Sequence, residues 1–201
     1  MKTIILASSS PRRKELLKNV GLKFRVESSA AFEQLDENLE PRELACRLSL
    51  TKARAVARRN RNAIVIAADT IGVLDRHIIG KPQTEHEAFE MLKSMSGKCH
   101  TVITGITVVD TDTMKQVTRS VETRVFFKQL SDFEIRTYVR SGEPMDKAGA
   151  YAIQGLGSLL VQKIEGDYFN VMGLPLSALA EVLKEFGVDM LRTAAVRRAN
   201  R

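Results

Sequence analysis

The sequence predicts an α/β protein with a mixed sheet flanked by helices, and three patterns support this prediction. Short apolar runs at Thr3–Ala7 and Ala63–Ala68 are typical of buried strands. An amphipathic segment at Glu43–Arg59, and a segment at Pro11–Asn19 that Gly21 terminates, alternate with these runs and predict helices. Two β-rich arms within residues 101–127 are joined by a polar turn, which predicts a long hairpin. Parallel strands joined by helices, together with an inserted hairpin, make the sheet mixed.

Boundary signals place the remaining elements. Ser10 is a natural N-cap, and Pro11 suits the first helical position. The apolar run before Asp69 predicts a strand that ends there, followed by a separate hairpin around Asp75. Further elements are expected as strands at Leu22–Glu27, Thr70–Leu74, His77–Ile79 and Leu159–Ile164, and as helices beginning at the capping residues Thr84 and Ser131 and at Ser177. With no repeat or clear linker in view, we expect one domain over residues 1–189 and a frayed basic tail over 190–201.

Charge is distributed unevenly along the 201 residues. The net charge is +7, but residues 1–61 hold fourteen Lys/Arg against seven Asp/Glu, and residues 191–201 hold four Arg and no acid. A local basic surface suits phosphate-bearing ligands, although a solvated surface without a partner has the same composition. Aromatic residues make up only 5% of the chain and Trp is absent, which argues against base stacking on nucleic acid.

The cysteines and histidines show no metal-binding pattern. Cys46 and Cys99 form no C-x-x-C pair, and the three histidines are scattered. No apolar stretch reaches the roughly 18 residues that a membrane-spanning helix needs. The apolar run near the N-terminus is too short for a signal peptide. We therefore expect a cytoplasmic protein with no membrane partner.

The segment Ser8–Arg13 is the first candidate site. Backbone N–H groups at a helix N-terminus attract anions, and Ser8 lets a phosphate approach closely. Arg12 and Arg13 oppose the helix dipole in the first turn, which is unfavourable unless an anion lies nearby. Their guanidinium groups can bind phosphate oxygens in pairs. A capped helix with solvated arginines is the alternative.

Asp69 and Lys52 are candidates for the chemistry. A carboxylate at the end of a buried strand lies where α/β sheets bind ligands, so Asp69 could bind a divalent cation or act as a general base. A turn Asp that caps backbone N–H groups is the alternative. Lys52 follows Leu48 by four residues, which puts it on the apolar face of its helix. A buried lysine needs a phosphate or a carboxylate as partner unless its amine reaches solvent.

Three further residues are weaker candidates taken alone. Lys81, in Gly80-Lys-Pro82, could bind phosphate or be an ordinary turn lysine. Glu33, in an acidic loop, could bind metal. Gln154, in a glycine-rich segment, carries both a donor and an acceptor, which suits the edge of a base.

Five motifs together resemble those of the Maf family of nucleotide pyrophosphatases, over about residues 3–186. In order they are Ser8-Ser-Ser-Pro-Arg-Arg13, Ala68-Asp-Thr70, Gly80-Lys-Pro82, Asp146-Lys-Ala-Gly-Ala-Tyr-Ala-Ile-Gln-Gly155 and Gly173-Leu-Pro175. The resemblance implies a two-lobed fold around a central cleft, like that of inosine triphosphate pyrophosphatases. One departure is Ser9, where the family commonly has Gly.

The resemblance also implies an activity and residue roles. The activity is hydrolysis of a nucleoside triphosphate to the monophosphate and pyrophosphate with a divalent cation, Mg²⁺ or Mn²⁺. The Ala-Gly-Ala-Tyr-Ala-Ile-Gln stretch is similar to that of the branch acting on dTTP and UTP. The family makes Asp69 the proton acceptor, ties Arg12, Thr70 and Gln154 to substrate choice, and places Glu33, Lys52 and Lys81 in the cleft.

In the resulting mechanism, Asp69 activates a water for in-line attack, while Glu33 and Asp69 are the expected metal ligands. Arg13, Lys52 and Lys81 neutralise charge on the leaving pyrophosphate. A homodimer is plausible from the family. Two alternatives stay open: a pyrophosphatase for another or modified nucleotide such as 7-methyl-GTP, and a nucleotide- or nucleic-acid-binding regulator of cell division.

Overall fold

The computed structural model describes residues 2–29 and 39–199, and it confirms the mixed α/β fold. Its sheet has seven strands in the order β2-β1-β3-β5-β6-β7, with β4 paired to β3. The strands are β1 (Thr3–Leu6), β2 (Arg25–Val26), β3 (Ala63–Leu74), β4 (His77–Ile79), β5 (Cys99–Asp110), β6 (Gln116–Phe127) and β7 (Val161–Glu165). The α-helices are α1 (Pro11–Asn19), α2 (Pro41–Ala57), α3 (Glu85–Met95), α4 (Asp132–Arg140), α5 (Tyr168–Val171), α6 (Leu176–Lys184) and α7 (Met190–Ala199), and the 3₁₀ turns are η1 (Glu143–Asp146), η2 (Ala148–Ala150) and η3 (Gly155–Leu160).

The chain forms two compact units. The first comprises residues 1–70, 104–121 and 173–201, and the second comprises residues 71–103 and 122–172. Strands β3, β5 and β6 each pass from one unit into the other along the chain. Pairing is parallel for β1 with β2 and β3, and antiparallel for β4 with β3 and β7 with β6.

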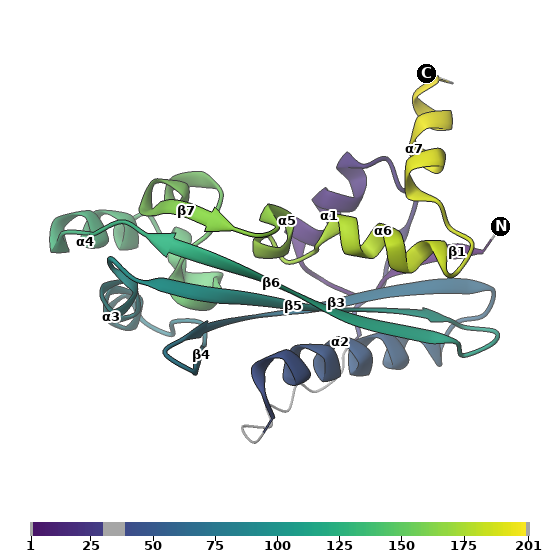
Figure 1. The fold of residues 1–201 in the computed structure, drawn as a ribbon, viewed down its shortest axis with the longest axis horizontal. Helices are drawn as coiled ribbons and strands as arrows, with labels where there is room; N and C mark the ends of the chain where they lie inside the picture. The colour runs from purple at the N-terminus through teal and green to yellow at the C-terminus, as the bar shows by residue number, and fades with distance from the viewer. Residues whose placement is uncertain (1, 30–38, 200–201) are drawn as a thin grey trace. The chain divides into compact units, whose positions relative to one another are not determined.

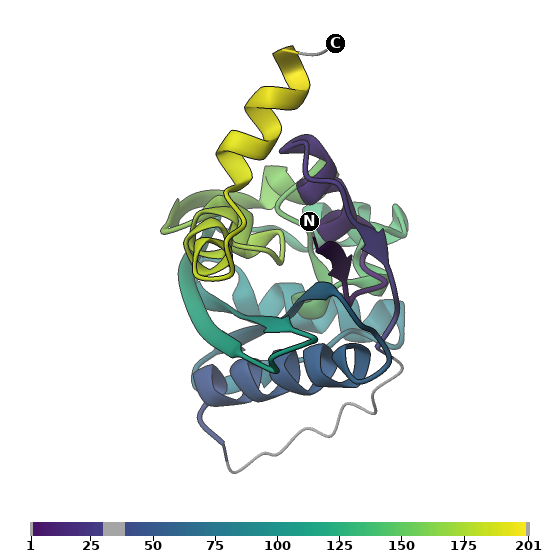
Figure 2. The same cartoon turned by 90° about the vertical axis from the view of Figure 1, so that its right-hand side faces the viewer.

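The strands of the first unit separate two layers of helices. Helix α2 lies on one face, and α1 and α6 lie on the other (Figures 1 and 2). Successive side chains of a strand point to opposite faces, so the odd-numbered residues of β3 share one face. That face packs against α2 in an apolar cluster of Ile5, Ala7, Ala53, Val56, Ala57, Ala63, Val65, Ala67 and Val109. Ile64 and Ile66 therefore point to the face that α1 and α6 cover.

A glycine brings α2 very close to β5. A Cβ built on Gly105 would lie 2.2 Å from the carbonyl oxygen of Ala45, so only glycine fits there without movement. On the same face, the hydroxyls of Ser49 and Thr107 lie 2.8 Å apart, and that of Thr107 lies 2.9 Å from that of Thr118. These contacts fix the height of α2 over the sheet.

The second unit has its own apolar core. Helices α3 and α4 pack together there, around buried side chains that include Leu92, Ile135 and Val139. His100 is buried beside Phe127 and Tyr151, and its Nε2 lies 2.8 Å from the Tyr151 hydroxyl. Burial lowers the pKa of His100 to about 4, so this imidazole is neutral in the folded protein at neutral pH.

Two sequence predictions are wrong. The strand before Asp69 does not stop there, because β3 continues without a break to Leu74 and pairs with β4 at its end. The apolar run ends at Asp69, but the strand continues because its later residues pair with β4. The C-terminal segment is helix α7 rather than a frayed end, since Asp189 accepts the Arg192 N–H at 2.9 Å and Met190 is buried.

The strand predicted at Leu22–Glu27 is observed only over the two residues of β2. The capped starts of α1, α3 and α4 are confirmed, with a full capping box at Ser131. No helix in the described residues is both long and apolar enough to cross a bilayer.

Candidate functional site

The N-terminus of α1 has the features expected of an anion site. The Ser10 hydroxyl accepts the Arg13 N–H at 3.5 Å, and Pro11 opens the helix. The first turn contains no acidic residue. Two arginines therefore face a positive helix end, an arrangement that is stabilised when an anion binds.

Arg13 binds three separate segments of the first unit. Its Nε donates to the Gly173 carbonyl at 2.7 Å, its Nη1 to Ser8 Oγ at 3.1 Å, and its Nη2 to Thr70 Oγ1 at 3.0 Å. A guanidinium group has five N–H donors in a rigid fork, so one arginine can hold several acceptors at once. Arg13 thus ties the entry to α1, strand β3 and the segment before α6 together.

Lys52 and Asp69 form a buried ion pair. The Lys52 residue is 9% exposed and Asp69 is 7% exposed, and Lys52 Nζ donates to Asp69 Oδ1. The prediction that Lys52 lies on the buried face of its helix is confirmed, and its partner is a carboxylate. Among the described residues, Lys52 is the donor that binds this carboxylate.

The Lys52–Asp69 pair and the Arg13 hydrogen bonds lie on opposite faces of β3. Asp69 shares the odd-numbered face with the α2 cluster, whereas Thr70 points to the other face and meets Arg13. Strand β1 ends at Leu6, opposite Ile66, while β3 runs on. Asp69 and Thr70 therefore lie on β3 beyond the end of β1, where the Ser8–Ser10 segment leads into α1. At such a strand end, side chains from both faces of a sheet can approach one ligand.

The second unit holds two of the predicted residues. The Gly149 N–H donates to the Gly80 carbonyl at 2.9 Å, so the segment before Lys81 and the turn η2 lie side by side. Lys81 is exposed, and Gln154 is half-buried at the start of η3. Gly149 has a φ of 72°, a conformation that favours glycine.

Glu143 orders the turn that follows Gln154, and sequence reasoning missed it. Its carboxylate accepts the N–H groups of Leu156 at 3.0 Å and Gly157 at 2.9 Å, and the Tyr138 hydroxyl at 3.0 Å. Partial burial raises the pKa of Glu143, but these hydrogen bonds outweigh burial and hold it below its usual value. No local motif marks this residue, because its partners are backbone groups thirteen or so residues away.

Glu33 and Asp69 are the predicted metal ligands. Glu33 lies outside the described residues. Within the described residues, no group of three His, Cys, Asp or Glu side chains could hold an ion. Asp69 presents one carboxylate, and Mg²⁺ commonly binds through one or two carboxylates together with substrate phosphates and water. Asp69 therefore suits a cation that arrives with a triphosphate.

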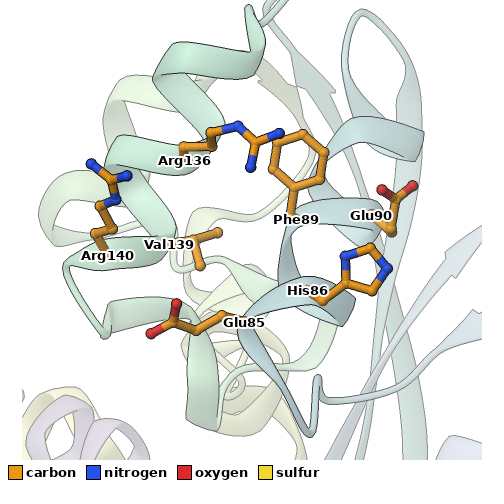
Figure 3. A pocket seen from close by; sticks show the side chains of 7 residues that line it. All are labelled: Glu85, His86, Phe89, Glu90, Arg136, Val139 and Arg140. Carbon is orange, nitrogen blue, oxygen red and sulfur yellow. The ribbon is translucent and has the colours of Figure 1, made fainter.

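A surface depression in the second unit contains none of the predicted site residues. It lies between α3 and α4 (Figure 3) and is lined by Glu85, His86, Phe89, Glu90, Arg136, Val139 and Arg140. The guanidinium of Arg136 lies 4.5 Å from the centre of the Phe89 ring, a cation–π contact. Its open, mixed-charge lining does not resemble a triphosphate site.

The sequence model of the Maf family, described as Maf-like protein, matches residues 3–186. This chain belongs to the Maf family. A dTTP/UTP pyrophosphatase of Thermoanaerobacter sp. (strain X514) is 52% identical over 190 residues, which cover 94% of this chain and 99% of that protein. For the dTTP/UTP pyrophosphatase of Desulforamulus reducens, the identity is 49%, covering 95% and 100%. For that of Bacillus cereus, the identity is 48%, covering 94% and 93%.

A more remote similarity is to the structure of the Staphylococcus aureus Ham1 protein. Its TM-score is 0.44 at 14% identity, over 64% of this chain and 73% of that one. The resemblance of the five motifs to the Maf family is thus confirmed by the family match over nearly the whole length of this Maf protein.

Proposed function

We propose that this Maf protein hydrolyses dTTP and UTP to the monophosphate and pyrophosphate. The observation that carries the proposal is the buried Lys52–Asp69 pair, in a chain about half identical to proteins described as dTTP/UTP pyrophosphatases. Burying an ion pair is costly, and a carboxylate kept at such a cost beside the end of β1 is a candidate for catalysis.

Asp69 is the general base in this proposal. Lys52 holds Oδ1, which orients the carboxylate so that Oδ2 can take a proton from water. The water oxygen forms a bond to the α-phosphorus as the bond from that phosphorus to the bridging oxygen breaks. The electron pair leaves with pyrophosphate, and the proton moves to Asp69.

The anion site of α1 binds phosphate in this proposal. The N-terminal N–H groups and Arg12 attract the triphosphate, and Arg13 fixes the frame through Ser8 and Thr70. Lys81 and Gln154 keep the roles that the family resemblance implies, phosphate binding and reading of the pyrimidine edge.

Asp69 would hold a divalent cation together with substrate phosphates, and Glu33 is the second proposed ligand. When bound, Mg²⁺ or Mn²⁺ offsets the negative charge of the triphosphate. We also propose a cytoplasmic location.

A substrate panel tests the proposal. The full chain is assayed with dTTP, UTP, GTP and 7-methyl-GTP, with and without EDTA, and the products are separated so that pyrophosphate is distinguished from phosphate. We expect pyrophosphate from dTTP and UTP and loss of turnover in EDTA. Preference for 7-methyl-GTP would contradict the assignment of substrate, and turnover unaffected by EDTA would contradict the metal.

A base variant tests the mechanism. Asp69→Asn keeps the size of the side chain but cannot accept the proton, so kcat should fall about 100-fold or more with KM little changed. Asp75→Asn is the control, because Asp75 is an exposed turn residue at the end of the same strand. Wild-type kcat in Asp69→Asn would show that the base is wrong.

A further inference from the structure

The buried hydroxyl of Thr104 belongs to the Arg13 network, although no motif includes it. Thr104 lies on β5 and is fully buried, with 0% exposure. Its Oγ1 lies 2.9 Å from Thr70 Oγ1. Thr104 and Thr107 are three residues apart on one strand, so their side chains point to opposite faces. Thr107 meets α2, and Thr104 therefore points to the Arg13 side.

The hydrogen bonds of Thr70 explain why Thr104 matters. A threonine hydroxyl has one proton to donate and two lone pairs to accept with. Arg13 Nη2 can only donate, so it occupies one lone pair of Thr70 Oγ1. The remaining contacts of Thr70 Oγ1 are with Thr104 at 2.9 Å and the Gly173 carbonyl at 3.5 Å.

Two proton arrangements satisfy these contacts. In one, Thr104 donates to Thr70 and Thr70 donates toward Gly173. In the other, Thr70 donates to Thr104. In both arrangements Thr104 decides the direction of the Thr70 proton and keeps Oγ1 in place for Arg13. The same carbonyl of Gly173 also accepts Arg13 Nε at 2.7 Å, so the four residues share one hydrogen-bond network.

We propose that Thr104 is a positioning residue for nucleotide binding, acting through Thr70 and Arg13. This role rests on the proposed function, because it assigns Thr70 and Arg13 to the substrate site. Thr104 itself is fully buried and touches no substrate. A displacement of about 1 Å in positioned groups can lower rates up to about 100-fold, so loss of one buried hydroxyl should be measurable.

The absence of a side chain at Gly173 makes room for the network. Gly173 has a φ of 100°, and a Cβ built there would lie 3.3 Å from Thr70 Oγ1 and 3.5 Å from Arg13 Nε. A larger residue at position 173 would press on both side chains, so glycine leaves the space that this hydrogen-bond network occupies.

Three variants test the proposal. Thr104→Val removes the hydroxyl at nearly constant shape, Thr104→Ser restores it, and Thr111→Val is the matched control. Thr111 is a buried threonine of the same unit whose hydroxyl binds the backbone of Ala63, away from Arg13. KM and kcat are measured for dTTP, and the Tm shift caused by inorganic pyrophosphate is measured for every variant.

We expect Thr104→Val to raise KM about tenfold and to reduce the pyrophosphate-induced Tm shift, and Thr104→Ser to return both toward wild type. Thr111→Val should lower Tm by a similar amount without changing KM. In a Thr70→Val background, Thr104→Val should add no further effect on KM, because the two hydroxyls act as one unit.

The outcomes separate this role from the proposed function. A wild-type chain inert toward dTTP and UTP would count against the function, and the pyrophosphate shift would still test Thr104. Equal KM values and equal pyrophosphate shifts in wild type and Thr104→Val would overturn the role. So would a Thr104→Ser variant that behaves like Thr104→Val.

Discussion

The amine of Lys52, in the C-terminal half of α2, donates to the carboxylate of Asp69, with about nine-tenths of each side chain removed from solvent. Burial of this kind leaves each charge dependent on the other. In the proposed mechanism the pair also orients the catalytic carboxylate, so its effects on stability and on turnover can be measured separately.

A double-mutant cycle should reveal this dependence. Lys52→Met leaves Asp69 buried without its cation, and we expect the free energy of unfolding to fall by about 3 kcal/mol. The double variant Lys52→Met/Asp69→Asn should lose less than the sum of the two single variants, as measured by urea unfolding at pH 7. Lys98→Met is the control, because the Lys98–Asp75 pair is exposed and should contribute little. Strictly additive losses would contradict coupling within the buried pair.

Arg12 and Arg13 should differ in their effect on stability. Arg13 donates to Ser8, Thr70 and Gly173, so Arg13→Ala should remove about 2 kcal/mol and lower Tm by about 6 °C. Arg12 has no hydrogen bond or ion pair to any described residue, so Arg12→Ala should keep Tm and raise KM for dTTP.

Thermal unfolding and steady-state kinetics check this contrast, and Arg13→Lys serves as a further control. A lysine keeps the charge but has no planar fork, so Arg13→Lys should not recover the lost Tm. An equal fall in Tm for Arg12→Ala and Arg13→Ala would show that the Arg13 network does not contribute to stability.

The contact of Gly105 with α2 predicts a change that acts on Lys52 from a distance. In Gly105→Ala, the new Cβ meets the Ala45 carbonyl, so α2 must shift and carry Lys52 away from Asp69. We expect a loss of about 2 kcal/mol in stability and a lower kcat. Gly72→Ala, whose Cβ would meet Ile79 at an ordinary 3.6 Å, is the control for a glycine within a strand. Urea unfolding and dTTP turnover are measured for both variants. Equal stability and equal kcat in Gly105→Ala and Gly72→Ala would mean that the close approach of α2 to Gly105 is not required.

Stability should fall in acid because His100 is buried as the neutral imidazole. Its pKa is about 4 in the folded chain, compared with 6.5 for an ordinary histidine, so between these values the unfolded chain binds more protons. The stabilisation is complete above pH 6.5 and is lost as the pH falls toward 4, by about 3 kcal/mol in all.

Urea unfolding from pH 7 to pH 4 measures this loss. His100→Gln should show a shallower dependence on pH, whereas the exposed His86→Gln should retain the wild-type slope. Identical slopes for wild type and His100→Gln would assign the acid sensitivity to other groups.

Local patterns were sufficient for most of the fold. The starts of three helices were predictable from their capping residues, Ser10, Thr84 and Ser131, because a capping hydroxyl binds backbone N–H groups of its own first turn. The spacing of Lys52 from Leu44 and Leu48 placed it on a buried face, since helix periodicity is a local property. The extent of β3 was missed because the apolar run stops at Asp69, whereas the strand is continued by pairing with a segment that follows it.

The sequence by itself determined the α/β class, the capped start of α1, the burial of Lys52 and, through its motifs, the family. Only the tertiary structure decided that Asp69 is the partner of Lys52, that Arg13 binds Ser8, Thr70 and Gly173, and that Thr104 supports Thr70. The physical reason is that helix caps and amphipathic faces depend on residues within a few positions of one another. The hydrogen bond from Arg13 to Gly173 joins residues that only the pairing and packing of distant segments brings within reach.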